Sequence, residues 1–350
     1  MIPQTKMQVP LFAGDGRIDW TTREVPKPGA GQLLMLIEAN ALCGSDRGQF
    51  YRGSEVTPGH EAVGVVVEAG PDTSAAAGTR GVIYAKDYCG ACRFCRMNMT
   101  NQCAASRGVI GFSEHGGYDP YVLIHERMLF PIGSDIPAGE ATLLLDIMGT
   151  GSRAINRARA LHSDIRSVLV CGAGPIGLGL LAMAKLLLGD DVPVAVSDFV
   201  PYRLELVKQL KGIPIALQET TLGEGIAAAG MNGVDVVLDA SGKESARRAG
   251  LALLRPGGVL VCVGHGEGLS FRAAEELINV EKAVIGSDYF SYGDLERNLA
   301  LYRAHRDYLA RIITHRFPAD RLQEAYKLFF ESGQTGKVVV EHAYEIRGQA

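Results

Sequence analysis

The sequence has no apolar run long enough to cross a bilayer and little net charge. A membrane-spanning helix needs about 20 apolar residues, whereas the apolar stretch LLAMAKLLLG is broken by Lys185. The formal net charge is −4, so the overall electrostatics do not favour nucleic acid or an anionic membrane as a partner. The first residues lack a basic segment followed by an apolar core, so no signal peptide is expected.

Cysteine is scarce, and its distribution argues against a disulfide framework. The chain has seven cysteines, an odd number, and Cys171 and Cys262 end apolar runs as small packing residues. One tight cluster without an export signal is typical of metal binding in a reducing cytoplasm. Four thiolates can surround a tetrahedral zinc ion, and such a closed site is structural because no position is open to substrate. The cluster, spaced C-x2-C-x2-C-x7-C, is Cys89, Cys92, Cys95 and Cys103.

The pattern along the chain changes near residue 166, which favours two domains in the 350 residues. Short β-type runs separated by Gly, Pro and Asp fill residues 1–140. Strand and helix patterns then alternate, as in SVLVCGAG followed by PIGLGLLAMAKLLLG. This alternation predicts parallel strands covered by helices on both faces.

A glycine-rich turn, G-x-G-x-x-G, joins an apolar strand to a helix. Gly172 permits a tight turn, Gly174 lets a pyrophosphate approach the backbone, and Gly177 allows close helix–strand packing. Asp198 ends the next strand, where a carboxylate binds the ribose hydroxyls of NAD and repels the 2′-phosphate of NADP. Arg203 could meet that phosphate, so NADP is only the less favoured cofactor. A turn without nucleotide, or one that binds S-adenosylmethionine, is the alternative. Further cofactor contacts are predicted at Pro175, Ile176, Ser241, Val263 and Gly264.

A second set of metal-type residues lies outside the cysteine cluster. Cys, His and carboxylate are all zinc ligands, and a catalytic zinc uses about three of them. Asp146 stands in the apolar run LLLDIMG, where a carboxylate needs a partner such as a cation. Ser45 could accept a substrate proton, and Asp46 could fix the tautomer of His60. Unrelated core and surface residues are the alternative reading of the four candidates, which are Cys43, His60, Glu61 and Asp146.

Together these segments resemble the zinc-dependent medium-chain dehydrogenase/reductases of the alcohol, sorbitol and threonine dehydrogenase type. The matching segments are CGSD, PGHE, the four-cysteine lobe, HGGYDPY, the Asp146 segment, GAGPIG and ITHRFPADRLQEAY…GKVV. They occur in the family's order and cover nearly the whole chain. The resemblance implies an α/β fold with a partly open, GroES-like β-barrel catalytic domain formed by 1–148 and 288–350. A Rossmann NAD-binding domain with a doubly wound parallel sheet, 149–287, is inserted between them, and the substrate lies in the cleft.

The resemblance also implies a reaction. A zinc held by Cys43, His60, Glu61 and Asp146 would polarise a secondary alcohol, with Glu61 the ligand that exchanges with water. Ser45 would relay the proton, and NAD would accept the hydride. A second, structural zinc falls at the four cysteines. The expected substrate is a polyol, sugar or sugar-derived acid, and the enzyme is expected to be a cytoplasmic homodimer or homotetramer, with KAVIGSDYF a candidate edge strand for subunit pairing.

Several alternatives stay open at this point. Within the family, the chain could be a threonine-like amino-alcohol dehydrogenase or a carbonyl reductase. It could also be a catalytically idle relative. The non-enzyme alternative is a zinc-ribbon binding protein, because four cations make the cysteine lobe basic, although stacking aromatics do not interleave with them. These cations are Lys86, Arg93, Arg96 and Arg107.

The chain departs from the family pattern at three places. Gly48 stands where the family often has the histidine that ends the proton relay, so another group must end it. His60 follows Cys43 by only 17 positions, which predicts a trimmed substrate loop. Asp119-Pro120 replaces a pair that is usually small and acidic, a change expected to concern packing.

Overall fold

The computed structural model describes residues 5–343, which divide into two compact units. Within these residues, unit 1 comprises 5–145, 313–332 and 337–343, and unit 2 comprises Asp146–Ile312 and Gly333–Gly336. No helix among the described residues has both the length and the apolarity that crossing a membrane requires. The α/β fold expected from the sequence is confirmed by the sheets of the two units.

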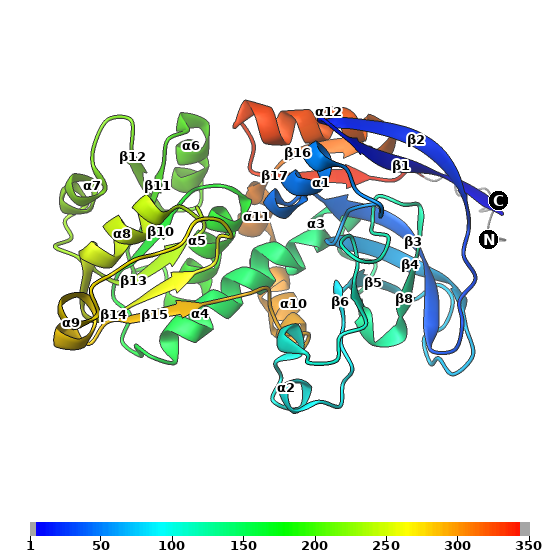
Figure 1. Ribbon diagram of the computed structural model, residues 1–350, viewed down its shortest axis with the longest axis horizontal. Coiled ribbons are helices and arrows are strands. Elements are labelled where there is room, and N and C mark those ends of the chain that lie inside the picture. The colour runs from blue at the N-terminus through cyan, green and yellow to red at the C-terminus, as the bar shows by residue number, and fades with distance from the viewer. Residues whose placement is uncertain (1–4, 344–350) are drawn as a thin grey trace. The chain divides into compact units, whose positions relative to one another are not determined.

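Unit 1 is built on an open seven-stranded sheet with the strand order β16-β17-β3-β4-β5-β9, to which β8 adds by pairing with β3 (Figure 1). β3 is buried along nearly its whole length, as expected for a central strand covered on both faces. Except for the parallel pair β16–β17, these strands pair antiparallel. The strands are β3 (Gln32–Ala41), β4 (Ala62–Ala69), β5 (Arg80–Ile83), β8 (Tyr121–His125), β9 (Leu129–Pro131), β16 (Ile313–Pro318) and β17 (Lys337–Glu341).

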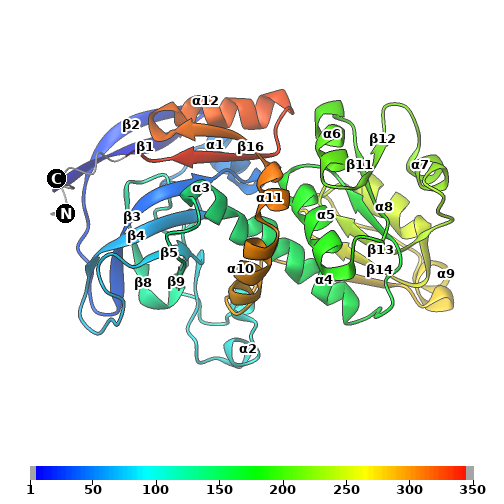
Figure 2. The same cartoon turned by 180° about the vertical axis from the view of Figure 1, so that it is seen from behind.

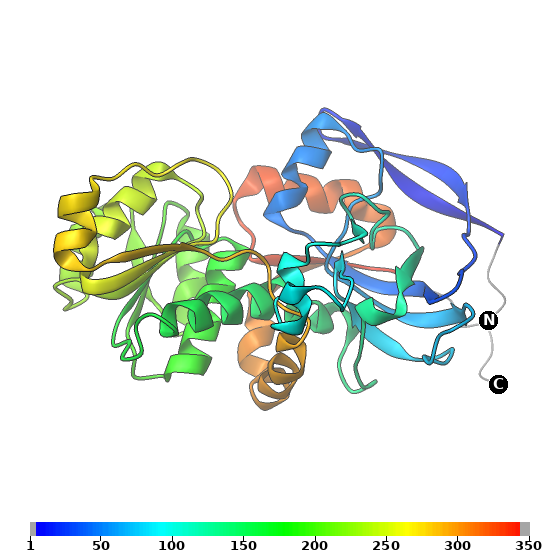
Figure 3. The same cartoon turned by 60° about the horizontal axis from the view of Figure 1, so that its bottom comes forward.

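An N-terminal hairpin and two helices enclose an aromatic cluster in unit 1. The hairpin joins β1 (Lys6–Gly14) to β2 (Arg17–Glu24), and α1 (Arg47–Arg52) packs against it (Figure 3). α12 (Leu322–Lys327) continues into the π-helical turn η9 (Leu328–Ser332). Rings from β1, α1, α12 and η9 form one core with Tyr118, to which β2 adds Ile18, because each element presents its apolar face inward. Its buried aromatic members include Phe12, Phe50, Tyr118 and Tyr326.

Short elements complete unit 1, mainly in its loops. Two of them, α2 and η2, belong to the cysteine lobe, which also contains the paired strands β6 and β7. The elements are η1 (Gly44–Asp46), β6 (Lys86–Asp87), α2 (Arg93–Arg96), η2 (Thr100–Gln102), β7 (Gly108–Val109), η3 (Glu126–Met128), α3 (Ala138–Ala141), η4 (Thr142–Leu144) and η8 (Ala319–Arg321).

Unit 2 contains a six-stranded, wholly parallel sheet in the order β12-β11-β10-β13-β14-β15. Helices cover both faces, as Figures 1 and 2 show from opposite sides. The order reverses between β10 and β13, so this is a doubly wound sheet whose ligand crevice is expected at their carboxyl ends. The strands are β10 (Val168–Cys171), β11 (Val194–Asp198), β12 (Ile213–Ala216), β13 (Val234–Asp239), β14 (Leu254–Cys262) and β15 (Ala283–Gly286).

The helices of unit 2 begin with a π-helical turn, η5 (Asp146–Thr150), that continues into α4 (Gly151–Arg159). In the crossovers through α5, α6 and α8, each helix packs on the strand before it and on the strand after it. The remaining helices are α5 (Pro175–Leu188), α6 (Pro201–Gln209), α7 (Leu222–Ala228), α8 (Glu244–Leu253), α9 (Ala273–Glu276), η6 (Ile278–Val280), α10 (Asp294–Ala304), α11 (Arg306–Leu309) and η7 (Ala310–Ile312).

The segment 288–312 belongs to unit 2 by its contacts. α10 packs against α4 and η5, which are both elements of unit 2. The hydroxyl of Tyr308 in α11 also donates a hydrogen bond to the carbonyl of Leu210, at 2.9 Å. The expected division assigned this segment to the catalytic domain, with boundaries at 148 and 287, and that functional division stays a prediction.

Candidate metal centres and nucleotide turn

The four clustered cysteines lie at the separations that a tetrahedral zinc requires. Their ligand atoms all lie within 4.8 Å of one another. Sulfur–sulfur distances are 3.9 Å for Cys89–Cys95, 3.5 Å for Cys92–Cys95 and 4.0 Å for Cys92–Cys103. Zinc–sulfur bonds of about 2.3 Å in a tetrahedron place the sulfurs about 3.8 Å apart. The cysteine set therefore fits a zinc ion.

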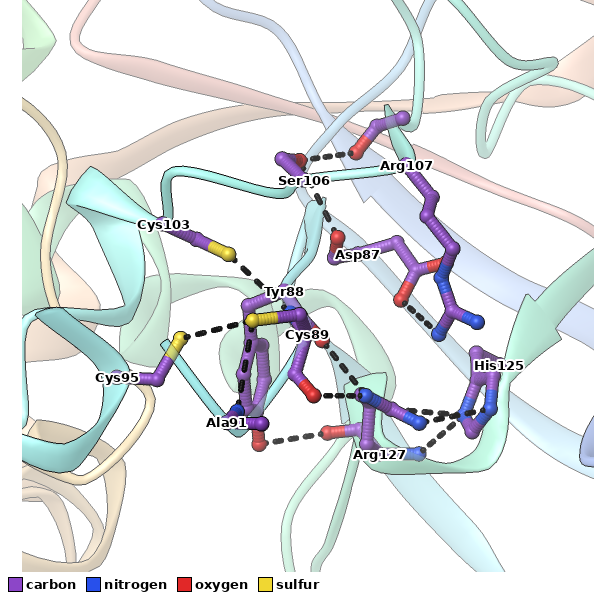
Figure 4. Close-up of polar contacts among 11 residues, drawn as sticks. Asp87, Tyr88, Cys89, Ala91, Cys95, Cys103, Ser106, Arg107, His125 and Arg127 are labelled. Atoms are coloured by element: carbon purple, nitrogen blue, oxygen red, sulfur yellow. Dashed lines mark hydrogen bonds and ion pairs between the residues drawn. The ribbon is translucent and has the colours of Figure 1, made fainter. Parts of the chain in front are cut away.

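Backbone N–H groups hold the thiols of this lobe in place (Figure 4). The N–H groups of Cys89 and Cys92 donate to Cys103 Sγ and Cys89 Sγ, each at 3.2 Å. The backbone N–H groups of Cys95 and Ala104 lower the pKa of Cys92 to about 6, because they stabilise the thiolate. The backbone thus favours the charged, metal-binding form of Cys92, whereas burial raises the pKa of Cys95 to about 12.

Arg127 connects Cys89, the first cysteine of the lobe, to the rest of unit 1 by hydrogen bonds. Its Nη1 donates to the carbonyl oxygens of Tyr88 and Cys89, at 3.0 and 2.6 Å (Figure 4). The hydroxyl of Tyr88 donates back to the carbonyl of Arg127, at 3.2 Å. Arg127 was not singled out from the sequence, because it lies 38 positions from Cys89.

The second predicted metal set is also brought together. Ligand atoms of its four members lie within 4.8 Å of one another, and all four side chains are buried. Each member lies at the start of a secondary-structure element: Cys43 directly precedes η1, the pair His60-Glu61 directly precedes β4, and Asp146 is the first residue of η5. Buried carboxylates need a counter-charge, and this donor set suits zinc. The members are Cys43, His60, Glu61 and Asp146.

Lys337 forms a buried ion pair with Glu61, and sequence reasoning missed it. The Lys337 ammonium donates to Glu61 Oε1, and neither side chain is exposed. The backbone N–H of Glu61 donates to Asn40 Oδ1 at 3.2 Å. Glu61 therefore has a protein cation beside it as well as the other candidate ligands. The signal in the sequence was a lysine directly before the apolar run VVV.

Asp46 lies beside His60. The distance from His60 Nδ1 to Asp46 Oδ1 is 3.4 Å, and both side chains are buried. Asp46 Oδ2 accepts hydrogen bonds from the backbone N–H of Cys43 and the hydroxyl of Tyr326, both at 3.2 Å. Burial, and next the Asp46 carboxylate, raise the pKa of Tyr326 well above its usual value, so this hydroxyl remains a donor. Tyr326 was not predicted from the sequence.

The residues predicted for proton relay lie on η1 and α1. Ser45 is exposed in the same turn that follows Cys43. At Gly48 an added Cβ would lie 2.5 Å from Arg52 Nη2, so the Arg52 guanidinium occupies the space of the missing side chain.

Phe112 packs on His60 with ring centroids 4.9 Å apart, and the Phe112 side chain is 44% exposed.

The glycine turn has the backbone that its spacing predicts. Gly172 has φ 93°, a left-handed conformation that favours glycine. A Cβ on Gly177 would lie 1.8 Å from the Gly172 carbonyl, whereas Gly174 faces open space. Pro175 and Ile176 open α5, whose free N–H groups attract anions. The turn is therefore shaped for a phosphate group.

Asp198 lies at this turn, at the end of β11. Its Oδ2 accepts a hydrogen bond from the backbone N–H of Ala173 at 2.7 Å, and its Oδ1 accepts one from Val200 at 2.8 Å. Each oxygen keeps a second lone pair for a ligand hydroxyl. Arg203 lies in the first turn of α6.

The other predicted cofactor residues gather at the carboxyl ends of β13 and β14. A Cβ on Gly172 would lie 3.4 Å from Ser241, and one on Gly264 would lie 2.5 Å from the nitrogen of Gly242. Val263 and Gly264 directly follow β14, and their N–H groups donate to the Asp239 carbonyl. These loops therefore adjoin the glycine turn.

Two known sequence families match separate parts of the chain. Residues 29–134 match the alcohol dehydrogenase GroES-like domain. Residues 175–304 match the zinc-binding dehydrogenase family. The first match covers most of the strands of unit 1, and the second lies within unit 2.

Curated relatives span nearly the whole chain. An uncharacterized zinc-type alcohol dehydrogenase-like protein of Escherichia coli K12 is 28% identical, over 95% of this chain and 98% of its own. The L-threonine 3-dehydrogenase of Pyrococcus horikoshii is 30% identical, over 90% and 92% of the two chains. The L-galactonate-5-dehydrogenase of Escherichia coli K12 is 28% identical, over 88% and 91%.

Solved structures share the fold. An alcohol dehydrogenase of E. coli CFT073, solved in complex with NADH, superimposes with a TM-score of 0.86. It is 23% identical, and the match covers 97% of this chain and all of that one.

Proposed function

The chain belongs to the zinc-dependent medium-chain dehydrogenases, and we propose that it oxidises the secondary hydroxyl group of a polyol, sugar or sugar-derived acid with NAD. The observation that carries this proposal is the buried group of thiol, imidazole and two carboxylates in a chain of this family. In the reaction, the alcohol carbon gives a hydride to NAD⁺ and the hydroxyl gives a proton. The products are a ketone, NADH and H⁺.

Three of the four buried residues, Cys43, His60 and Asp146, are proposed as the lasting ligands of the catalytic zinc. Glu61 is proposed as the fourth, exchangeable ligand, because the Lys337 ammonium competes for its carboxylate. A zinc ion held there would supply Lewis-acid chemistry that lowers the pKa of an alcohol. The four clustered cysteines are proposed to bind a second, structural zinc.

Other side chains orient these ligands and move the proton. Asp46 is proposed to hold His60 in one tautomer, since its carboxylate faces Nδ1 and leaves Nε2 for the metal. The Tyr326 hydroxyl fixes Asp46 from its other oxygen. Ser45 is proposed to accept the substrate proton, and because position 48 is glycine, water or the cofactor ribose passes it onward.

The cofactor is proposed to be NAD. Its pyrophosphate would bind at Gly172, Gly174 and Gly177, where the N-terminus of α5 attracts anions. The Asp198 carboxylate would accept the adenine-ribose hydroxyls and repel the extra phosphate of NADP. Pro175, Ile176, Arg203, Ser241, Val263 and Gly264 are proposed as further contacts.

Two substrate classes have support among the relatives. The L-galactonate-5-dehydrogenase supports a sugar-derived acid. The L-threonine 3-dehydrogenases, at 30% identity, support an amino alcohol as the second candidate.

Subunit pairing is proposed through β15, which forms one edge of the parallel sheet of unit 2. Its unpaired backbone groups offer a template for the same strand of a second copy, which would give a homodimer or, with a further interface, a homotetramer. All seven cysteines are unbridged, which supports a reducing cytoplasm as the location.

A substrate screen tests the proposed function. Purified, zinc-loaded protein is assayed with NAD and with NADP against panels of polyols, sugar acids and threonine, following absorbance of the reduced nicotinamide. We expect turnover with at least one sugar-derived alcohol and a preference for NAD. If threonine is the one substrate oxidised, the substrate is an amino alcohol. If no substrate leads to reduction of NAD or NADP, the proposed function is wrong.

A further inference from the structure

Arg247 and Asp239 form a buried ion pair at the carboxyl end of the unit 2 sheet. The Arg247 Nε donates to Asp239 Oδ2 at 2.6 Å, and the two side chains are 8% and 0% exposed. Arg247 lies on α8, and Asp239 is the last residue of β13. Neither residue belongs to the metal sites or the glycine turn.

The two partners of this pair hold two different loops. Arg247 Nη2 donates to the carbonyl of Gly264 at 2.5 Å, and Nη1 donates to the carbonyl of Glu267. On the other side, Asp239 Oδ1 accepts hydrogen bonds from the backbone N–H and the hydroxyl of Ser241, at 2.9 and 2.6 Å. The pair therefore ties the loop after β13 (240–243) to the loop after β14 (263–268).

The two loops touch backbone to backbone. A Cβ on Gly242, where φ is +68°, would lie 2.1 Å from the carbonyl oxygen of His265. One on Gly266 would lie 2.5 Å from the Gly242 carbonyl oxygen. Such contact leaves no room for adjustment, so the position of each loop depends on the other.

These two loops lie on the side of β10 away from Asp198, the residue proposed to bind the adenine ribose. A dinucleotide lies across the point where the strand order reverses. Asp198, on β11, is on one side of β10, whereas β13 and β14 are on the other. With the adenine ribose at Asp198, the nicotinamide half lies over the β13 and β14 loops.

A buried ion pair contributes little net stability to a folded protein. Removing two charges from water costs about as much as their attraction returns, and apolar substitutes are often as stable. What the guanidinium adds is geometry, because its planar fork reaches a carboxylate and two carbonyls at once. We infer that Arg247 is a positioning residue for the nicotinamide half of the cofactor. This inference rests on the proposed dinucleotide binding.

The experiment compares a whole cofactor with its adenosine half. Zinc-loaded wild type and Arg247→Met are titrated with NADH by nicotinamide fluorescence and with ADP-ribose by calorimetry. We expect NADH to bind at least about tenfold more weakly to the variant, a change of about 1.4 kcal/mol, because Arg247 would no longer hold the two loops in place. ADP-ribose, which lacks nicotinamide, should bind with unchanged affinity.

Two further variants keep the test decisive. Arg248→Met is the matched control, because Arg248 is the next residue on α8 but is 40% exposed and pairs with Glu276; both affinities should match wild type. Arg247→Lys keeps the charge without the fork and should give an intermediate loss for NADH, and it replaces Arg247→Met if that variant does not fold.

The outcomes separate this inference from the function on which it rests. Wild type that binds no NADH would refute the proposed function itself. Wild type that binds NADH, with variants that bind it equally well or that lose NADH and ADP-ribose together, would overturn the positioning role of Arg247 alone.

Discussion

Lys337 and Glu61 form an ion pair in which neither side chain has access to solvent. Lys337 begins β17 and Glu61 precedes β4, and the central strand β3 pairs with both strands. The two residues are 276 positions apart, so the fold alone brings them together. Because Glu61 also lies within the second candidate metal set, the ammonium and a bound metal ion would compete for one carboxylate.

Replacing Lys337 by methionine should make the protein depend on zinc for stability. Without Lys337 the Glu61 carboxylate is buried with its nearest cation removed, a defect that costs about 3–5 kcal/mol. We expect that loss in metal-free protein and a smaller loss with zinc, since the carboxylate can then bind the metal. Urea unfolding with and without zinc measures both values.

The control for this prediction is the double variant Lys337→Met with Glu61→Gln. It removes the buried charge, so zinc should change the cost of the lysine substitution much less. An equal loss of stability in metal-free and zinc-loaded Lys337→Met would contradict the competition between ammonium and metal.

Cys43→Ala and His60→Ala should each abolish catalysis and leave the nucleotide site intact. Removing one ligand of a three-ligand centre removes the Lewis acid, and we expect kcat to fall at least about 10³-fold. NADH affinity and the circular dichroism spectrum should stay as in wild type, and zinc content should fall by one ion per chain. Loss of the folded state in both variants would instead make these residues structural.

Cys95→Ser should remove the other zinc ion and lower stability. The lobe around Cys95 has few buried side chains, so the metal holds much of it together. We expect one zinc per chain rather than two and a thermal midpoint lower by about 5 °C or more. Cys262→Ser is the matched control, because Cys262 lies on β14 outside both metal sets. Two bound zinc ions in Cys95→Ser would exclude Cys95 as a ligand.

Asp198→Asn should narrow the preference for NAD over NADP. The amide keeps one oxygen acceptor but loses the charge that repels a 2′-phosphate. We expect the ratio of kcat/KM for NAD to that for NADP to fall by about tenfold, the effect of one charge-assisted hydrogen bond. Steady-state kinetics with both cofactors measures it. An unchanged ratio would remove Asp198 from the ribose site.

Asp119 should make the free energy of unfolding fall as the pH rises, whereas most carboxylates have the opposite effect on stability. Burial raises its pKa from 3.8 to about 6, and Arg23, 2.5 Å away, only partly opposes this. The folded protein thus holds the proton more tightly than the unfolded chain. The stability it contributes is complete below about pH 4 and is lost as the pH rises through about 6.

Comparison with Asp119→Asn isolates that titration. Between about pH 4 and pH 7, the free energy of unfolding of wild type should fall relative to the variant by up to about 3 kcal/mol. Urea unfolding at several pH values gives the difference. A difference that moves the opposite way would mean that the Arg23 guanidinium outweighs burial.

The parts of the site that could be predicted from the sequence are local. The glycine turn and the cysteine lobe each lie within a short segment, where spacing determines geometry. For Cys43, His60 and Asp146, residue type and spacing left two interpretations open, a shared metal site or unrelated core and surface residues. The order of the motifs along the chain favoured the metal site.

The partners that were missed are set by tertiary packing. Lys337, Tyr326 and Arg247 each reach a site residue from another element, and no periodicity reports such a pairing. β16 was also missed, since its six residues are only partly buried or exposed and give little apolar signal. Nor does the sequence of α10 show that this helix packs against α4 and η5.

The aromatic cluster of unit 1 connects the N-terminal hairpin to Asp46, which lies beside the candidate metal ligand His60. Phe12, on the N-terminal hairpin, meets the Tyr326 ring edge-on at 5.2 Å, and Tyr326 in turn bonds Asp46. A hairpin that supplies no candidate ligand is therefore connected to the His60 imidazole through two intermediate residues, Tyr326 and Asp46. If His60 binds the proposed zinc, a change in the packing of this hairpin would alter the orientation of a metal ligand that the hairpin does not contact.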